Sequence, residues 1–209
     1  MTNNIMDALK EETRALHNQT EGNDLQKSLF GGNAPKSQFV EYLGQMYLIH
    51  KALEDALSQL QKDHSVIATV IDDLQFQQNY LQTDLSAAAI KAEALKPLPA
   101  TKKLIDHINQ LKAKQPMSLL GCEYVLFGSK HGAKMLVKRL EKYELWKPGA
   151  PNYFDPYGDK FMQHWQDFKA KMNAAQFSVA EQAQIIQGAK DMFSYLAEVF
   201  DDLYKIDTF

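Results

Sequence analysis

Apolar residues recur three and four positions apart along most of the chain, which is the spacing of one face of an α-helix. The longest such run lies at 37–60, where Ser37 is the expected N-cap. No stretch alternates apolar and polar residues as a half-buried strand does, and no Asn-Gly hairpin turn occurs. The pattern therefore predicts an all-α protein. The apolar face of 37–60 consists of Phe39, Tyr42, Leu43, Met46, Tyr47, His50, Leu53, Leu57 and Leu60.

Capping and breaking residues set the expected ends of the other helices. Thr101 is expected to cap one helix, and Ser178 forms a capping box with Glu181 at the start of the last one. Residues 22–36 are expected to be irregular because glycines and a proline interrupt them, and 87–95 could be helix or loop. The remaining helices are predicted at about 5–18, 65–81, 101–111, 118–143, 158–173 and 179–203.

Composition limits the class of protein. The chain has 209 residues, 45% of them apolar, and shows no linker or internal repeat, so we expect one domain over 1–209 with about seven to nine helices. The net charge of −3 forms no basic face, which argues against nucleic-acid binding. Cys122 is the single cysteine, which fits a reducing compartment. No signal peptide or membrane span is predicted, so the expected location is the cytoplasm.

His17 and Glu21 lie one helical turn apart on the first predicted helix. A histidine with one ring nitrogen held by a carboxylate or by water can present the other nitrogen to a metal. A half-buried histidine beside a glutamate at a helix end has the same spacing. The pair alone does not separate the two interpretations.

Gly128 and Gly132 interrupt an otherwise favourable helix, and each costs about 1 kcal/mol relative to alanine in a helix interior. Such glycines either allow a tight helix crossing or let the helix bend and bring its backbone against a flat ligand. The crossing is the simpler explanation. A flat ligand gains weight because polar atoms gather at the same place, from Ser129, Lys130, His131 and Lys134.

Taken together, these stretches resemble the heme oxygenase family. The order of the similar segments is kept over most of the chain and is weakest at about 61–111. The glycine segment looks most like the compact bacterial branch. The similar segments are Leu9-Lys10-Glu11-Glu12-Thr13, His17-Asn18-Gln19-Thr20-Glu21, Met46-Tyr47-Leu48-Ile49-His50-Lys51-Ala52-Leu53-Glu54, Gly128-Ser129-Lys130-x-Gly132-Ala133, Lys169-Ala170-Lys171-Met172-Asn173, Ala189-Lys190-x-x-Phe193 and Phe200.

The resemblance implies a helical bundle that holds haem between the first helix and the glycine-bent helix. His17 would bind the iron, and Gly128, Ser129 and Gly132 would be the catalytic positions on the other face of the ring. Lys10 and Lys169 would hold the propionates, and the other choices for this role are Arg14, Lys134 and Lys171. The cofactor-binding residues that the resemblance implies are Lys10, Glu21, His131, Lys169, Phe193 and Phe200.

The reaction implied by the resemblance is cleavage of haem by O2 to biliverdin, CO and ferrous iron. The chain has no Gly-x-Gly-x-x-Gly segment, so electrons would come from a separate reductase, ferredoxin or flavodoxin. No Glu-x-x-His pair occurs, which counts against a carboxylate-bridged di-iron bundle. No His-Glu-x-x-His segment occurs, which makes a zinc protease improbable.

Two departures from the family keep other functions open. Ser129 replaces the aspartate of animal members, as in bacterial members, which would move the distal water network onto backbone and other side chains. His131 is expected to point away from the iron, near the haem edge. If it reached the iron instead, a non-catalytic haem carrier or sensor would be favoured. A haem-free, thiaminase-like enzyme would depend on Cys122, for which a buried and inert position is expected.

Overall fold

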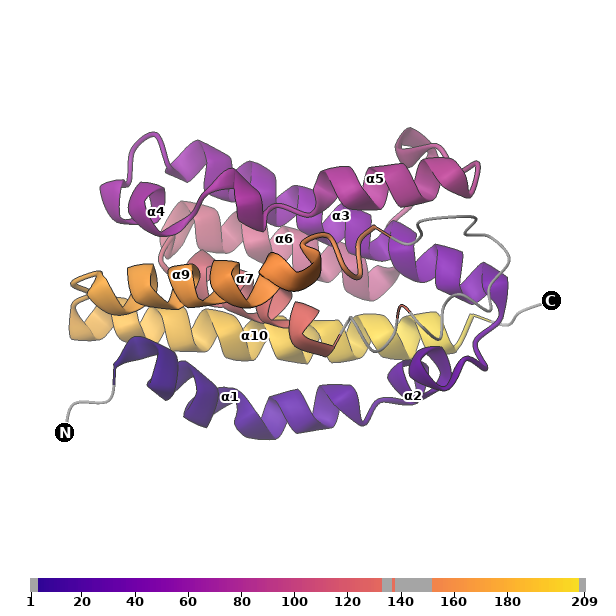
Figure 1. Cartoon of the computed structure of the whole chain (residues 1–209), viewed down its shortest axis with the longest axis horizontal. Helices are drawn as coiled ribbons and strands as arrows, with labels where there is room; N and C mark the ends of the chain where they lie inside the picture. The colour runs from indigo at the N-terminus through magenta and orange to yellow at the C-terminus, as the bar shows by residue number, and fades with distance from the viewer. Residues whose placement is uncertain (1–3, 133–136, 138–151, 207–209) are drawn as a thin grey trace.

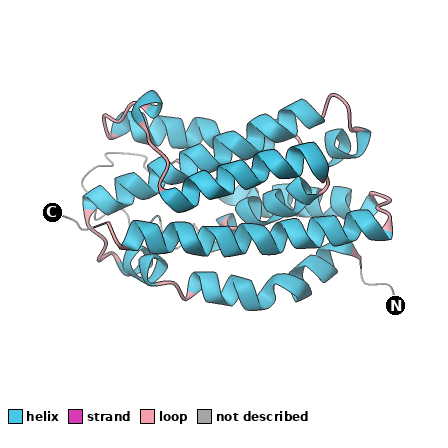
Figure 2. Ribbon diagram, turned by 180° about the vertical axis from the view of Figure 1, so that it is seen from behind, coloured by secondary structure: helices cyan, strands magenta, loops and turns pink. Residues whose placement is uncertain are grey.

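The structure is a computed structural model that describes residues 4–132, 137 and 152–206, and within these ranges every regular element is a helix (Figure 1). Strands are absent from that part of the chain, so the all-α prediction is confirmed (Figure 2). The elements are α1 (Ile5–Glu21), α2 (Asp24–Gly31), α3 (Lys36–Leu60), α4 (Ser65–Val70), η1 (Asp73–Gln75), α5 (Gln78–Ala87), η2 (Ala92–Ala94), α6 (Pro99–Lys114), α7 (Ser118–Gly128), η3 (Gly158–Lys160), α9 (Phe161–Ala174) and α10 (Val179–Tyr204).

The helix α10, with 26 residues, runs along most of the molecule (Figure 1). It packs most extensively against α7, and also against α1, α6 and α2, while α3 packs against α5 and α6. None of the described helices is both long and apolar enough to cross a membrane. Because α1 and α7 both rest on α10, one helix supports the two segments predicted to face haem. The residues that α10 buries are Ile185, Gly188, Ala189, Met192, Phe193, Leu196, Val199, Phe200 and Leu203.

The contact between α7 and α10 is a crossing of backbone against backbone. A Cβ atom placed on Gly121 would lie 1.9 Å from the carbonyl oxygen of Ile185, and one on Gly188 would lie 2.1 Å from that of Ser118. No side chain larger than hydrogen fits at either glycine. Cys122 lies beside this crossing and donates its thiol hydrogen to the Gly188 carbonyl at 3.5 Å. The crossing fixes α7, and with it the position of the helix break at its far end.

The prediction of an irregular segment at 22–36 is wrong, because α2 occupies part of it. The side chain of Asn23 accepts the Leu25 N–H and caps the start of α2, while Gly32, at φ 71°, ends it in the left-handed conformation. Leu25 and Leu29 are fully buried. The breaking residues mark the end of a short helix here, and burial of its apolar face stabilises the rest.

Three other predicted boundaries also change. Neither Ser37 nor Thr101 is a cap, because α3 begins after Pro35 and α6 begins at Pro99 with proline in its first turn. The single helix predicted at 65–81 is wrong, since α4 ends at Val70 and α5 begins only at Gln78. Residues 87–95 are mainly turn and loop around η2. The capping box of Ser178 is confirmed.

The helix predicted at 118–143 is interrupted early. Helical conformation stops at Gly128, turns at Ser129 and resumes at 130–132, while 133–136 and 138–143 lie outside the described residues. The helix predicted at 158–173 is present as the short η3 followed by α9. Gly158 has φ 55°, a left-handed conformation that suits glycine at this turn.

Candidate functional site

His17 lies on the exposed side of α1, one turn before Glu21. Its side chain is 51% exposed, and its Nε2 lies 3.6 Å from Oε1 of Glu21, whose side chain is 71% exposed. Buried Ile5, Met6 and Leu9 hold α1 to the protein core. The imidazole is therefore held on a fixed helix, yet neither burial nor a short hydrogen bond prevents it from binding a ligand.

Phe193 is the α10 residue that contacts this imidazole. The two ring centroids are 5.7 Å apart and the rings meet edge to face at 74°. Phe200, the other predicted phenylalanine, packs against Tyr42 in the core with ring centroids 6.0 Å apart. The structure thus brings Phe193 to His17, whereas Phe200 contributes to the core.

The two glycines of the helix break at 128–132 have different surroundings. A Cβ atom on Gly132 would meet none of the described residues within 4 Å, while one on Gly128 would lie 3.4 Å from the indole of Trp165 on α9. The hydroxyl of Ser129 donates to the carbonyl of Leu126 at 2.7 Å, closing the last turn of α7. The backbone at Gly132 is therefore open to a ligand, and Gly128 is covered by an aromatic side chain.

His131 is exposed and turned toward α9. Its Nδ1 lies 2.8 Å from the carbonyl oxygen of Gly128, so this nitrogen carries the hydrogen and donates it. The ring meets Phe161 and Trp165 edge to face, with centroids 4.8 and 4.9 Å away. These contacts hold the ring among aromatic side chains of α9.

The predicted propionate partners differ in how strongly they are already engaged. Lys10 on α1 is exposed and Lys169 on α9 is half-buried, and neither pairs with a carboxylate among the described residues. Arg14 is likewise exposed on α1. Lys171 forms an ion pair of 2.7 Å with Asp72, and Lys134 lies outside the described residues. Lys10 and Lys169 thus stay the stronger candidates.

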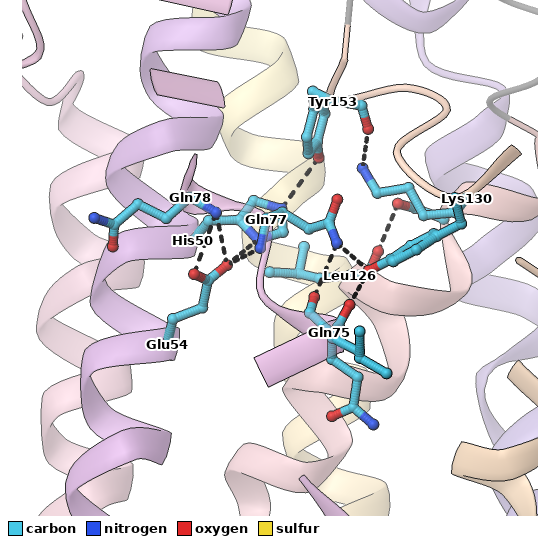
Figure 3. A network of polar contacts seen from close by, with 11 residues as sticks. His50, Glu54, Gln75, Gln77, Gln78, Leu126, Lys130 and Tyr153 are labelled. Carbon is cyan, nitrogen blue, oxygen red and sulfur yellow. Dashed lines mark hydrogen bonds and ion pairs between the residues drawn. The ribbon is translucent and has the colours of Figure 1, made fainter. Parts of the chain in front are cut away.

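A buried polar network lies behind the helix break, and sequence reasoning did not find it (Figure 3). His50 Nδ1 lies 3.1 Å from Glu54 Oε1, and His50 Nε2 lies 3.1 Å from the hydroxyl oxygen of Tyr153. The carboxylate can only accept, so Nδ1 carries the hydrogen and Nε2 accepts from the tyrosine. Burial lowers the pKa of His50, and the neighbouring carboxylate of Glu54 opposes that shift.

Glu54 also supplies the cap that α5 lacks. Gln77, the residue before α5, makes no side-chain cap of its own. The backbone N–H groups of Gln77 and Gln78 donate instead to Glu54 Oε1, at 2.6 and 3.1 Å. One carboxylate from α3 therefore satisfies two N–H groups at the start of α5, which places α5 against α3.

Lys130 is buried between the two glycines of the break. Its Nζ donates to the carbonyl oxygen of Tyr153 at 2.9 Å and lies 3.1 Å from the centre of the Tyr153 ring (Figure 3). Burial holds the pKa of Lys130 well below its usual value, and the carboxylates of Glu123, Glu54 and Asp84 oppose that shift. The sequence shows only a lysine between glycines, since the residues that surround it come from distant segments.

The segment that follows the undescribed residues is anchored at both ends. Asp84 accepts the backbone N–H groups of Asn152 and Tyr153 at 2.8 and 2.9 Å. The hydroxyl of Tyr157 donates to the carbonyl of Leu74 and accepts from the side-chain amide of Gln77. A cavity of about 200 Å³ lies between this segment and the break, and His17 does not border it.

Cys122 is buried, as expected. Burial raises the pKa of its thiol, and the carboxylates of Asp191 and Glu123 raise it further. The reactive thiolate is disfavoured at this position, which counts against a cysteine nucleophile.

Curated proteins similar in sequence to this chain include heme oxygenases. Heme oxygenase 2 of Mus musculus is 25% identical over 215 residues, which covers 95% of this chain and 65% of the relative. Heme oxygenase 1 of Gallus gallus is 26% identical over 218 residues, covering 99% of this chain and 72% of the relative. The chain thus spans a little under two thirds of the length of the mouse relative.

Solved structures show the same fold. Heme oxygenase-1 of the cyanobacterium Synechocystis, in complex with heme, has a TM-score of 0.87 at 20% identity, covering 96% of this chain and 92% of that one. Heme oxygenase of Leptospira interrogans has a TM-score of 0.86 at 20% identity, covering 95% and 98%. The family model described as heme oxygenase matches residues 3–202. Because that match covers nearly the whole sequence, the chain belongs to the heme oxygenase family.

Proposed function

We propose that this chain is a heme oxygenase that binds haem through His17 and cleaves it with O2 to biliverdin, CO and ferrous iron. The observation that carries the proposal is the half-exposed imidazole of His17, which rests on Phe193 beside the carboxylate of Glu21. The named relatives on the family's fold support it.

The residues present fit a haem. A neutral imidazole suits haem iron, and the ring of Phe193 suits the apolar face of the porphyrin. Lys10 and Lys169 are cations for the two propionates, and the bare backbone at Gly132 leaves room above a flat ring. This is the set of groups that haem requires, on the elements where the family resemblance assigns them.

Bound haem supplies the iron and the oxidative chemistry, and the protein supplies binding, orientation and electrostatics. When haem is bound, His17 would hold its iron from α1, and Glu21 would be the group to hold the other ring nitrogen of the imidazole. Gly132 leaves its backbone uncovered, so that the main chain itself limits the space on the other face. Ser129 keeps its proton directed to the Leu126 carbonyl and is no strong acid.

Electrons come, in this proposal, from a separate reductase, ferredoxin or flavodoxin. The sequence holds no dinucleotide-binding segment that would let the chain accept electrons from a nicotinamide cofactor directly. A cytoplasmic location belongs to the same proposal, and the single buried cysteine supports it.

The test is to add haemin to the wild type and to His17→Ala, and then a reductant under air. We expect the wild type to lose its Soret band and form biliverdin. His17→Ala should lose the iron ligand and most of the turnover, and added imidazole should restore the spectrum. His64→Ala, a change at the start of α4, is the control and should behave as the wild type.

Two results would contradict the proposal. Unchanged binding and turnover in His17→Ala would remove His17 from the site. A low-spin, six-coordinate spectrum that resists O2 and is lost in His131→Ala would indicate a haem carrier instead of an enzyme.

A further inference from the structure

Lys130 is the only charged side chain in the described part of the helix break, and it is buried. The exposed fraction of Lys130 is 5%, whereas the neighbouring His131 is exposed. A buried ammonium group is costly unless hydrogen bonds and opposite charges compensate for lost water. The groups that contact the buried ammonium of Lys130 therefore indicate its role.

Both direct contacts of the Lys130 ammonium group described above are made with Tyr153. Its Nζ binds the carbonyl oxygen of Tyr153 and lies over the ring of the same residue, so a single side chain makes two contacts with one partner. Tyr153 is itself fixed, because Asp84 accepts its N–H at 2.9 Å and His50 accepts from its hydroxyl. Lys130 thus links the break to residues of α3 and α5.

The direction of the side chain is also informative. Lys130 lies two residues after Gly128 and two before Gly132. Two residues correspond to about 200° around a helix, so the lysine leaves the backbone on the side opposite both glycines. In Figure 3 it reaches toward Tyr153 and the network around His50 and Glu54. The lysine therefore leaves the side of Gly132 free for a ligand, while Trp165 covers Gly128.

The two glycines make such a contact useful. Glycine gives a helix more backbone freedom than any other residue, and a helix with two of them bends easily. A segment that must keep its main chain at a fixed height above a ligand needs a restraint that places no side chain on the ligand side. The Lys130 contact provides this restraint.

We propose that Lys130 is a positioning residue, which fixes the backbone of 128–132 through Tyr153 and so sets where the bare main chain faces the haem ring. This inference rests on the proposed function, in which haem lies against Gly132. It adds to that function a residue that decides which part of the ring is oxidised.

The first test uses haem-free protein and amide hydrogen exchange. Lys130→Met keeps the length of the side chain and removes the charge and the hydrogen bond, so amides of 128–132 and 152–157 should exchange about tenfold faster. Gln38→Leu is the matched control. It removes one buried hydrogen bond of 3.0 Å to the Leu203 carbonyl, at the start of α3, and should leave exchange at 128–132 unchanged.

The second test is the distribution of biliverdin isomers after haem cleavage. Lys130→Met should still bind haemin through His17 and should give a broader mixture of isomers than the wild type. Gln38→Leu should lower stability and keep the wild-type isomer ratio, since a purely structural defect does not redirect the reaction. An unchanged ratio together with unchanged exchange in Lys130→Met would overturn the proposal.

The wild type alone also tests the inference, should Lys130→Met fail to fold. Amides of 128–132 should then be protected at least about tenfold over the unfolded-peptide rate in haem-free protein. Exchange at the rate of an unstructured peptide would overturn the role of Lys130. Failure of the wild type to bind haemin would instead overturn the proposed function, so the two failures are distinguishable.

Discussion

His17 and His50 show how position decides what a histidine can do. His17 is half-exposed on α1, with a long contact to Glu21, so its ring can bind a ligand. His50 is buried, and both its nitrogens are engaged by Glu54 and Tyr153. The first suits ligation of a metal, and the second is a neutral structural group.

The burial of His50 predicts a pH dependence of stability. Its pKa is lowered in the folded protein, while the unfolded chain titrates near the ordinary value of about 6.5. Below about pH 6.5, His50 binds a proton in the unfolded chain but stays unprotonated in the folded protein until the pH reaches its lower folded pKa. Stability should therefore fall as the pH drops from about 6.5 toward the folded pKa, by at most about 1.4 kcal/mol per pH unit.

Urea unfolding at pH 7.5, 6.5 and 5.5 checks this, with His50→Gln as the comparison. Glutamine keeps a donor and an acceptor but does not titrate, so the variant should lose less stability on acidification than the wild type. Glu54, Lys130 and Tyr153 face His50 in both proteins. Equal losses in the two proteins would contradict the prediction.

At the scale of elements, the start of α5 depends on a residue of another helix. Glu54 accepts two backbone N–H groups there. Glu54→Ala leaves the buried N–H of Gln77 and the partly buried N–H of Gln78 without this partner, and should cost about 3 kcal/mol of unfolding free energy, with faster amide exchange in α5. Ser178→Ala is the control, since it removes the local cap of α10 at a cost of about 1 kcal/mol. If Glu54→Ala made amide exchange faster in α3 but left it unchanged in α5, the carboxylate would not hold α5.

Opposite effects are expected for glycine substitutions at the crossing of α7 and α10 and at the helix break. Gly188→Ala would place a methyl group 2.1 Å from the Ser118 carbonyl, so the helices must separate, at a cost of about 1 to 3 kcal/mol or more. Gly132→Ala meets no atom of the described part of the chain within 4 Å and should gain up to about 1 kcal/mol in helix propensity. Thermal unfolding of haem-free protein measures both. A Gly188→Ala protein as stable as the wild type would mean that the helices do not touch there.

At the scale of the molecule, binding of haem should stabilise the whole fold. α10 contacts α1 through Phe193 beside His17 and also supports α7. Haemin at 100 times its Kd should raise the unfolding free energy by about 2.7 kcal/mol. Thermal scans should show this shift in the wild type and a much smaller one in His17→Ala. A shift of equal size in the variant would mean that haemin binds elsewhere.

Most of the fold could be predicted from apolar spacing, because long helices that bury one face repeat that pattern many times. The short α2 was missed since its described buried side chains, Leu25 and Leu29, lie between residues that resemble a loop. The break between α4 and α5 was missed because the start of α5 is capped by Glu54 of α3, a contact that no local sequence pattern reveals.

The candidate site could be predicted only in part, and the division has a physical cause. His17 with Glu21, and Gly128 with Gly132, are close in sequence and resemble a known family, so they could be found. The partners of Lys130 could not, since Tyr153 is 23 residues away along the chain and His50 is 103 residues from Tyr153. Contacts of that separation follow from packing and leave no spacing to recognise.

The lone thiol of Cys122 has a practical consequence. It sits where α7 meets α10 and donates to the Gly188 carbonyl, so a labelling reagent can reach it only after those helices part. The rate at which Cys122 is alkylated therefore reports how often α7 and α10 separate. Because Cys122 is the single cysteine of the sequence, this measurement needs no engineered label site.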